Sequence, residues 1–346
     1  MTLLNAPDLI GEAPIFLDAL SHASASALLN RPLLICGERG SGKELIAERV
    51  HFLSPRWERP FVKVNCAALS EDLLDAELFG SEAGAFTGAQ KRRAGRFERA
   101  NGGTLFLDEI PSASQRVQEK LLRVIEYGEF ERIGGQETLK TDVRTIAAAN
   151  VDLLAMAARG DFRADLLDRL SFDVVVSPPL RARQQDIPIL AAYFANRIAA
   201  EVDKPYPGFT PDAISKLTDY RWPGNVRELK NAAERSCYRW LSADKEGPID
   251  SVVINPFAGT SLPLTLTENS SNLDTDYTSL PDDAASISAI SQSNFPFDLR
   301  DHLNTVEKTI VADTLKHFHG SQKKAGDALG LNYNQIRGLV RKHTLS

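Results

Sequence analysis

The chain has 346 residues, which is enough for two or three domains. Apolar residues make up 43% and charged residues 25%, close to the average of soluble globular proteins. The sequence has no run of 18 uncharged apolar residues, and its N-terminus has no basic head followed by an apolar stretch. We therefore expect neither a transmembrane helix nor a signal peptide, and we predict a cytoplasmic protein. The three cysteines are odd in number and scattered, which argues against a disulfide scaffold. The six histidines show no metal-ligand spacing with them, which argues against a zinc site.

Charge is distributed unevenly along the chain. The formal net charge is −6, which by itself argues against a nucleic-acid partner. Residues 259–293 carry five acidic side chains and no Lys or Arg, whereas residues 319–346 carry five basic side chains and one acidic side chain. The acidic segment is rich in Ser and Thr and cannot bury enough apolar surface to offset its ordering entropy. We therefore expect a flexible linker at 259–294, followed by a small basic domain.

Short apolar runs alternate with helical patterns in the first half of the chain. Runs with the length and flanks of buried strands lie at 33–36, 61–64, 104–107 and 143–147. Helical stretches between them lie at 44–52, 71–78 and 117–126. This alternation predicts an α/β fold, in which a parallel sheet is covered by helices on both faces. Beyond about residue 180 the strands stop, and a helical subdomain is predicted from the patterns at 186–202, 211–219 and 225–241.

A glycine-rich segment follows the first predicted strand and opens a helix, which is the context of a phosphate-binding loop. Its residues, here called the phosphate loop, are Gly37, Glu38, Arg39, Gly40, Ser41, Gly42, Lys43 and Glu44. Glycines allow backbone N–H groups to converge on phosphate oxygens, and Lys43 is predicted to reach the outer phosphates of ATP. Glu44 stands where a Ser or Thr would hold Mg²⁺, so direct metal binding at that position stays open. The alternative is a glycine-rich turn with an exposed lysine.

Two acids, Asp108 and Glu109, end another predicted strand, at the edge where open α/β sheets bind ligands. We expect Asp108 to hold Mg²⁺ and Glu109 to polarise the water that attacks ATP. Asn65, at the end of a further strand, is predicted to hydrogen-bond Glu109 and control its orientation. A strand that ends in Asp-Glu is often only a solvated strand end. Together with the phosphate loop, however, it makes nucleotide hydrolysis the leading interpretation.

A rarer signal is a hexapeptide made up of Gly84, Ala85, Phe86, Thr87, Gly88 and Ala89. It resembles the signature loop of the AAA+ activators of σ54 RNA polymerase, the bacterial enhancer-binding proteins. The stretches at 77–80, 162–170 and 222–229 are similar to other motifs of this family, which also tolerates Glu at the position of Glu44. The resemblance covers roughly residues 6–258 and, weakly, the C-terminus. It implies an AAA+ P-loop ATPase fold with a helical lid, ATP and Mg²⁺ as cofactors, and contact between the hexapeptide and σ54.

The resemblance also implies roles for four polar residues. Arg163 and Arg169 are similar to the arginine fingers that reach the γ-phosphate in a neighbouring subunit, which implies a homo-oligomeric ring, typically a hexamer. Without the family likeness, these two arginines would be interpreted as surface ion pairs. Arg227 is similar to the sensor residue of the helical subdomain. Asn150 stands at the strand end of the first sensor, directly after Ala149, where a threonine is common in the family.

Within this family the chain is similar to the phage shock activators, which begin directly with the AAA+ domain. Residues 1–36 alone precede the phosphate loop, so we expect no receiver or sensory domain and expect regulation from outside the chain. The resemblance implies phage shock protein A as the inhibitor and envelope stress as the setting. Trp57, in an expected loop, is either packed or exposed, and an exposed tryptophan is a candidate anchor for that inhibitor.

The C-terminal segment has the pattern of a small helical domain. Residues that recur on one face of a helix are Leu299, Leu303, Val306 and Ile310, and Gly320 ends the helical stretch. Two further helices are predicted at 323–329 and 332–343, an arrangement that matches a helix-turn-helix and resembles the Fis-type DNA-binding domain of the same activators. The predicted DNA-binding residues are Lys323, Lys324, Asn332, Tyr333, Asn334, Gln335, Arg337, Arg341 and Lys342. A basic helical hairpin that does not bind DNA is the alternative.

Three functions fit some of these features: a transcription activator bound to upstream enhancer DNA, a chaperone-type ATPase of the same fold, and a DNA-binding repressor whose nucleotide site is only regulatory. The hexapeptide argues against the second, and the paired acids argue against the third. We therefore predict an ATPase that remodels the closed complex of σ54 RNA polymerase into an open complex. The expected domains are an α/β nucleotide-binding subdomain at 1–175, a helical lid at 176–258, the linker at 259–294 and the helix-turn-helix domain at 295–346.

Overall fold

The computed structural model describes residues 9–85, 91–257, 299–318, 320–331 and 333–343. The chain divides into two compact units, Met1–Ser261 and Leu262–Ser346, and each is described by itself. Among the helices in the described ranges, none combines the length and the apolar character needed to cross a membrane.

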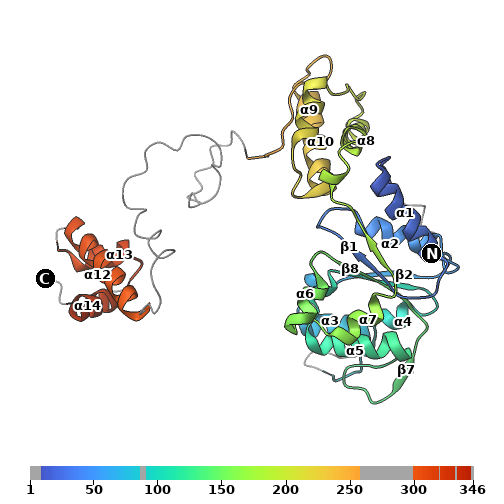
Figure 1. Ribbon diagram of the computed structural model, residues 1–346, viewed down its shortest axis with the longest axis horizontal. Coiled ribbons are helices and arrows are strands. Elements are labelled where there is room, and N and C mark those ends of the chain that lie inside the picture. Colours follow the sequence, from blue (N-terminus) through green and yellow to red (C-terminus); the bar gives the residue numbers. More distant parts are fainter. Residues whose placement is uncertain (1–8, 86–90, 258–298, 319, 332, 344–346) are drawn as a thin grey trace. The chain divides into compact units, whose positions relative to one another are not determined.

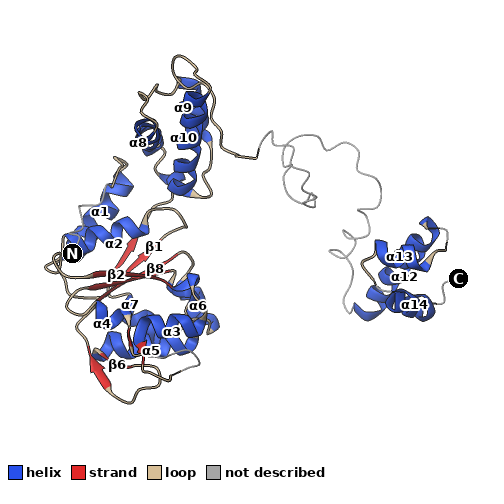
Figure 2. Cartoon of the chain, turned by 180° about the vertical axis from the view of Figure 1, so that it is seen from behind, coloured by secondary structure: helices blue, strands red, loops and turns tan. Residues whose placement is uncertain are grey.

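The first unit is built on a five-stranded parallel sheet with the strand order β2-β5-β8-β1-β9 (Figures 1 and 2). Its strands are β1 Leu33–Cys36, β2 Phe61–Asn65, β5 Thr104–Asp108, β8 Arg144–Ala149 and β9 Val174–Val176. The first four confirm the strands predicted from the apolar runs. The edge strand β9 has no counterpart among the predictions, because three residues are too short a run to distinguish from a loop.

Helices cover both faces of the sheet, as predicted (Figure 1). One face carries α1 Pro14–Ala27 and α2 Lys43–Phe52, and the other carries α3 Glu71–Phe79, α5 Gln115–Tyr127, α6 Leu153–Arg159 and α7 Ala164–Leu170. Successive residues of a strand point to opposite faces, so Phe106 of β5 packs with α1 and α2 whereas Leu105 and Leu107 pack with the other layer. The two buried clusters fix the sheet between its helical layers, and with it the strand ends that carry Asn65 and Asp108.

Two short antiparallel hairpins interrupt the α/β pattern. Strands β3 Gly80–Ser81 and β4 Arg93–Ala94 flank the 82–90 loop, which contains the hexapeptide, and helix α4 Arg96–Arg99 follows. The second hairpin consists of β6 Glu129–Glu131 and β7 Thr138–Lys140. The two hairpins are joined by backbone hydrogen bonds, because the Glu82 N–H donates to the Ile133 carbonyl and the Ile133 N–H donates to the Gly80 carbonyl, each at 3.0 Å.

A helical subdomain, here called the lid, follows the sheet (Figure 2). The short turn η3 Leu180–Ala182 leads into it, and its helices are α8 Asp186–Glu201, α9 Pro211–Asp219 and α10 Asn225–Ser242. Each of these helices ends within one residue of the predicted range. The buried Trp222 and Leu229 pack against Leu190 in the core of the lid, and the Trp222 indole donates to the Leu217 carbonyl at 2.7 Å.

The second unit contains three helices within its described residues, α12 Leu299–His317, α13 Gln322–Ala328 and α14 Tyr333–Lys342. They confirm the predicted helices, but the predicted apolar face of α12 is wrong at Ile310, which is 50% exposed. Val311 and Leu315 are buried instead, in a cluster with residues of α13 and α14. One residue along a helix turns the side chain by about 100°, so the packed face runs one position away from the predicted one. The side chains of Leu299, Leu303 and Val306 lie outside the described residues.

Candidate nucleotide site

The phosphate loop forms the turn between β1 and α2, as its sequence predicts. Gly40 (φ +74°) and Gly42 (φ +104°) adopt left-handed conformations that side-chain-bearing residues rarely adopt. At Gly40 a side chain is also excluded by space, since a Cβ atom there would lie 2.3 Å from the Gly224 carbonyl oxygen of the lid. The Gly37 N–H donates to the Ala149 carbonyl at the end of β8, at 3.0 Å. The loop is therefore fixed by the sheet on one side and by the lid on the other.

Lys43 begins α2, and its ammonium group lies against the phosphate loop. Nζ donates to the Gly37 carbonyl at 2.7 Å and to the Glu38 carbonyl at 2.9 Å. Burial lowers the pKa of Lys43, and the neighbouring Asp108 and Glu109 act in the opposite direction. An ammonium group held at this position supplies the cation that phosphate binding requires.

The carboxylate of Glu44 is directed to β2 rather than to the phosphate loop. It accepts a hydrogen bond from Lys63 Nζ at 2.8 Å, and Lys63 also pairs with Glu48. Asp108 is therefore the better candidate for a Mg²⁺ ligand, because oxygen ligands suit that ion and the Asp108 carboxylate faces the loop cation. Burial raises the pKa of the Asp108 carboxyl, while Lys43 lowers it. Asp108 Oδ1 also accepts a hydrogen bond from the Glu109 N–H at 3.0 Å.

Glu109 follows β5 in a left-handed conformation, with φ +51°. Its carboxylate pairs with the Arg39 guanidinium, with Oε1 3.2 Å from Nε and Oε2 3.3 Å from Nη2. The hydrogen bond predicted between Asn65 and Glu109 is not formed. Asn65 stands opposite Asp108 in the sheet, but its Oδ1 accepts from the Ala67 N–H at 2.9 Å and caps the turn η1 Cys66–Ala68. The bond from Ala67 fixes the orientation of the Asn65 amide within its own turn, and Nδ2, the atom that would donate to Glu109, forms no hydrogen bond to that carboxylate.

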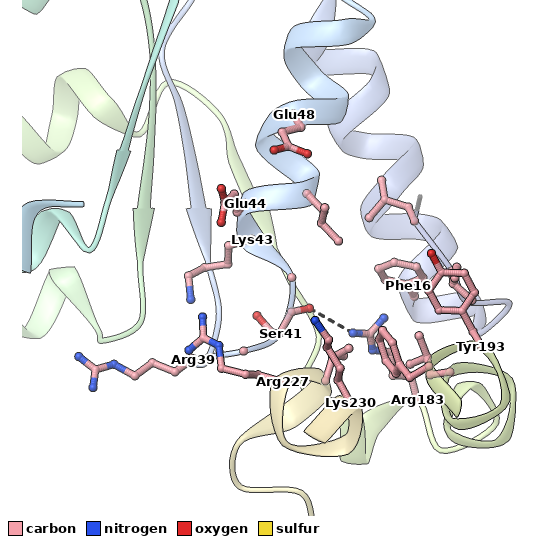
Figure 3. Close-up of a pocket in the computed structure, with 18 of the residues that line it drawn as sticks. Phe16, Arg39, Ser41, Lys43, Glu44, Glu48, Arg183, Tyr193, Arg227 and Lys230 are labelled. Atoms are coloured by element: carbon pink, nitrogen blue, oxygen red, sulfur yellow. Dashed lines mark hydrogen bonds between the residues drawn. The ribbon is translucent and has the colours of Figure 1, made fainter. Parts of the chain in front are cut away.

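A cavity of about 590 Å³ opens at the phosphate loop and is lined by residues of the sheet edge, of α1 and of the lid. Its size is that of a small-molecule site. Lys43 and Arg39 lie at one end, and Arg227 and Lys230 approach the loop from the lid (Figure 3). The aromatic rings of Phe16 and Tyr193 lie at the other end (Figure 3). The cavity thus has cations at the phosphate loop, which suit the phosphates of a nucleotide. Its other end has two aromatic rings, which suit the base, with Arg183 over Phe16 and Arg197 over Tyr193.

Asn150, Arg163 and Arg169 do not line this cavity. Asn150 follows β8 directly and is half-buried at the sheet edge that carries Asp108. The Arg163 guanidinium pairs with Asp165, and that of Arg169 pairs with Glu126, each at 2.7 Å. Both arginines thus take part in surface ion pairs within the chain, and exposed pairs of this kind contribute little to stability.

The hexapeptide is described only at its first two residues, because Phe86, Thr87, Gly88 and Ala89 lie outside the described ranges. Gly84 has a left-handed φ of +82°, and the Ala85 N–H donates to the Glu82 carbonyl at 3.3 Å. Arg132 holds the base of the 82–90 loop, since its buried guanidinium bonds Glu82 at 2.8 Å and Glu98 at 2.6 Å.

Trp57 lies in the turn between α2 and β2 and is 46% exposed. One edge of the indole meets the Phe52 ring, with 6.3 Å between the ring centroids. Of the two alternatives for this residue, the structure thus favours the exposed one.

The predicted DNA-binding residues that the structure describes lie on α13 and α14. Those with exposed side chains are Lys323, Lys324, Tyr333, Gln335, Arg337, Arg341 and Lys342. Asn332 and the side chain of Asn334 lie outside the described residues. Lys342 Nζ is 2.5 Å from a carboxylate oxygen of Glu307 on α12, so one of the predicted contacts is already paired within the unit.

Two residues that contact the Glu38 side chain, Arg181 before the lid and Asn225 within it, are not among the predicted site residues. Arg181 pairs with Glu38 at 2.6 Å, and Asn225 Nδ2 donates to the same carboxylate at 3.1 Å. These bonds, led by the one from Arg181, lower the pKa of Glu38 to about 2. Arg181 and Glu38 are 143 positions apart in the chain, so only the folded structure brings them together.

A phosphate loop, a strand that ends in Asp-Glu and a helical lid around one cavity define a P-loop ATPase of the AAA+ class. Residues 9–175 match the family described as the Sigma-54 interaction domain, and residues 181–245 match the AAA+ ATPase lid domain. The chain belongs to the σ54-dependent transcription activators, a family of AAA+ ATPases.

Individual relatives agree with this assignment. The chain is 52% identical to the Psp operon transcriptional activator of Escherichia coli K12, over 98% of both proteins. It is 51% identical to the Nif-specific regulatory protein of Azotobacter vinelandii, over 66% of this chain and 43% of that protein. The solved structure of NtrX from Brucella abortus in complex with ATP has a TM-score of 0.67 and 29% identity, and the match covers 98% of this chain and 70% of that one. The predicted family, AAA+ fold, ATPase activity and activator function are confirmed.

Proposed function

We propose that this activator hydrolyses ATP in the cavity described above and uses the cycle to convert the closed complex of σ54 RNA polymerase into an open complex. The observation that carries the proposal is the convergence of Lys43, Asp108 and Glu109 at one sheet edge, in a chain that matches the Sigma-54 interaction domain. The similarity to the Psp operon transcriptional activator of Escherichia coli supports the further proposal that the genes served belong to the phage shock response.

The residues of the cavity fit a complex of ATP with Mg²⁺. Lys43 and the N–H groups of the phosphate loop would bind the phosphates, Asp108 would hold the metal ion, and Glu109 would polarise water. Arg227 approaches the same end from the lid and would report on the nucleotide, and Asn150 would complete the polar edge. Mg²⁺, when bound, neutralises part of the negative charge on the phosphates.

The active assembly would be a homo-oligomeric ring, and the resemblance to the family implies a hexamer. In this ring Arg163 and Arg169 would leave their ion pairs with Asp165 and Glu126 and reach the γ-phosphate held by the neighbouring subunit. Such an exchange costs little, because exposed ion pairs are weak. An arginine that stabilises the charge of a transferring phosphoryl group accelerates the reaction strongly.

The second unit would bind DNA. The basic residues of α13 and α14, Lys323, Lys324, Arg337 and Arg341, are exposed and would contact phosphates and base edges in upstream enhancer DNA. The proposed boundaries lie at residue 175 between the α/β subdomain and the lid, at 258 before the linker and at 294 before the DNA-binding domain. A linker between the ATPase and the DNA-binding domain would raise the local concentration of the activator near its promoter.

Regulation would come from an inhibitor protein of the phage shock protein A type. Trp57 is the candidate contact, because a half-exposed indole in a turn offers a large apolar area to a partner. Its position between α2 and β2 places this turn at the far end of the helix that Lys43 begins.

The test is open-complex formation by σ54 holoenzyme, followed by permanganate reactivity of the promoter with and without ATP. Lys43→Ala is expected to lose nucleotide binding, because it removes the main cation of the loop. Glu109→Gln is expected to keep ATP binding but to lose turnover by about 100-fold or more, since it removes the group that polarises water. An equal loss of ATP affinity in both variants would contradict this division of roles. Promoter opening by the wild-type protein without ATP would contradict the proposed function.

A further inference from the structure

Three consecutive carbonyl groups of the phosphate loop accept hydrogen bonds from the lid and from the segment that leads into it. The pairs are Asn225 Nδ2 with the Arg39 carbonyl (3.0 Å), the Val226 N–H with the Gly40 carbonyl (3.1 Å) and Arg183 Nη2 with the Ser41 carbonyl (3.1 Å). Figure 3 shows the last of these bonds. Two of the three donors are side chains, so they can be removed by substitution.

Hydrogen bonds to these carbonyls determine how the loop presents its N–H groups. The C=O and the N–H of one trans peptide point in opposite directions. A donor on the carbonyl of Arg39, Gly40 or Ser41 therefore turns the N–H of the following residue away from that donor. The N–H groups concerned are those of Gly40, Ser41 and Gly42, in the half of the loop expected to converge on phosphate oxygens. Of these, the Ser41 N–H also donates to the Glu38 carbonyl, at 3.3 Å.

Arg183 is buried beside the Phe16 ring, and its ion pair is a long one. Its guanidinium is 3% exposed, and the nearest Asp186 carboxylate oxygen is 3.9 Å away. Asp186 uses its other oxygen, Oδ1, to accept two backbone N–H groups at the start of α1, at 2.7 and 2.9 Å. Within the part of the chain that the structure describes, the Ser41 carbonyl is the acceptor that Arg183 hydrogen-bonds. The Phe16 ring, 4.3 Å from the guanidinium carbon, and the long ion pair offset only part of the cost of burying this charge, so the hydrogen bond to the Ser41 carbonyl is a substantial part of what holds Arg183 in place.

Asn225 is also fully buried, and its backbone has a left-handed φ of +53°, a conformation that Asn and Gly tolerate best. Besides the Arg39 carbonyl, Nδ2 contacts the Glu38 carboxylate at 3.1 Å. Oδ1 accepts the Leu180 N–H at 2.8 Å. One amide thus connects the start of α10, the segment before α8 and the phosphate loop.

We propose that Arg183 and Asn225 are positioning residues for phosphate binding: they orient the peptides of the phosphate loop and tie that orientation to the position of the lid. The inference rests on the proposed function, since it requires nucleotide phosphates at this loop. The lid also extends Arg227 and Lys230 into the cavity. The same subdomain therefore contacts the carbonyl side of the loop and approaches the phosphates directly, so a shift of the lid changes phosphate affinity.

The experiment compares Asn225→Gly and Arg183→Lys with the control Arg181→Ala, all in the full chain. Asn225→Gly keeps the left-handed backbone accessible and removes the amide, whereas Arg183→Lys keeps the charge on a differently shaped donor. Arg181→Ala removes a partner of the Glu38 side chain but touches no loop carbonyl. Steady-state ATP hydrolysis gives KM and kcat, and a fluorescent ADP analogue gives Kd without hydrolysis.

Asn225→Gly and Arg183→Lys are expected to raise KM and the Kd of the ADP analogue about tenfold, with kcat within about threefold of wild type, because they remove ground-state binding. Arg181→Ala is expected to change these constants by less than about twofold. Should Arg183→Lys not fold, Asn225→Gly alone decides.

A lower melting temperature with unchanged KM and Kd would give the two residues a merely structural role and overturn the inference. A fall in kcat with unchanged Kd would place them in hydrolysis and overturn it as well. A wild-type protein that does not bind the ADP analogue would overturn the proposed function and the inference together. If the wild-type protein binds the ADP analogue and both variants bind it with the same Kd, only the inference is overturned.

Discussion

The Glu109 carboxylate is paired with the guanidinium of Arg39, a residue of the phosphate loop itself, with 3.2 Å between Oε1 and Nε. The Arg39 side chain is 66% exposed, whereas that of Glu109 is 18% exposed. The pair joins the residue proposed to polarise water to the loop proposed to hold phosphate. A guanidinium at this place competes with water for the carboxylate and holds Glu109 in one orientation, so we expect the pair to restrain hydrolysis.

Arg39→Ala is expected to raise kcat for ATP hydrolysis by about two- to fivefold. An exposed ion pair contributes about 0.2–1 kcal/mol, and without Arg39 this free energy no longer has to be supplied before Glu109 can orient the water. Arg39→Lys is the control, because it keeps the positive charge and is expected to stay near the wild-type rate. Steady-state turnover at saturating ATP measures the difference. A tenfold or larger fall in Arg39→Ala would show that Arg39 assists hydrolysis rather than restraining it.

Elements of the fold are predictable where burial alone decides them. The runs in β1, β5 and β8 are buried except for the last residue of β1 and of β5, and they are recognised directly as strands. The edge strand β9 is not, because only its central valine is buried. The helix α12 shows a related limit, since several apolar residues compete for the packed face and only contact with α13 and α14 selects Val311 over Ile310.

Residues of the site are predictable where a local motif carries the chemistry, as at Lys43 and Asp108. Their pairings are not. Asn65 can bond its own turn or a neighbouring strand, and the sequence does not decide between a local and a cross-strand partner. Glu38 finds Arg181 and Asn225 only after the lid has folded against the loop.

Arg163→Ala and Arg169→Ala are each expected to lower ATP hydrolysis by about 100-fold or more, because the transferring phosphoryl group loses a stabilising cation. Their partners within the chain, Asp165 and Glu126, form exposed pairs, so the free energy of unfolding is expected to change little. Turnover and urea unfolding, measured on the same preparations, separate the two effects. If stability falls as strongly as activity, the loss of hydrolysis is explained by the fold, and the two arginines are not fingers.

Mixing either arginine variant with Glu109→Gln protein checks action across a subunit interface. Some interfaces in a mixed ring combine an intact arginine with an intact Glu109, so part of the activity should return. No recovery at any ratio, with mixed rings confirmed by native mass spectrometry, would contradict action in trans.

We expect His51 to make the stability of the first unit depend on pH. It is fully buried on α2, with Nδ1 2.9 Å from the Thr104 hydroxyl and its ring stacked on Phe61. Burial lowers the pKa of His51 to about 4. The unfolded chain titrates near pH 6.5 and so binds more protons between these values. The free energy of unfolding should therefore fall as the pH drops through this window, by up to about 1.4 kcal/mol per pH unit from this group.

His51→Gln keeps a hydrogen-bonding group beside Thr104 and removes the titration. Urea unfolding at pH 4.5, 5.5 and 7 is expected to show a flatter pH dependence in the variant than in the wild type. Parallel curves for the two proteins would exclude His51 as the cause.

Thr87→Ala tests whether the hexapeptide transmits the hydrolysis cycle to σ54. The 82–90 loop is anchored through Glu82 to Ile133 and Arg132, and neither residue lines the nucleotide cavity. Because the described residues that anchor the loop do not line the cavity, ATP turnover is expected to stay within about twofold of wild type. Open-complex formation and binding to σ54 in the presence of ADP with aluminium fluoride are expected to disappear, since the hydroxyl and methyl groups proposed to grip σ54 are gone. Thr87→Ser keeps the hydroxyl and should retain part of both activities. A Thr87→Ala protein that binds σ54 and opens promoters at the wild-type rate would falsify this role for the loop and make the chaperone alternative the stronger one.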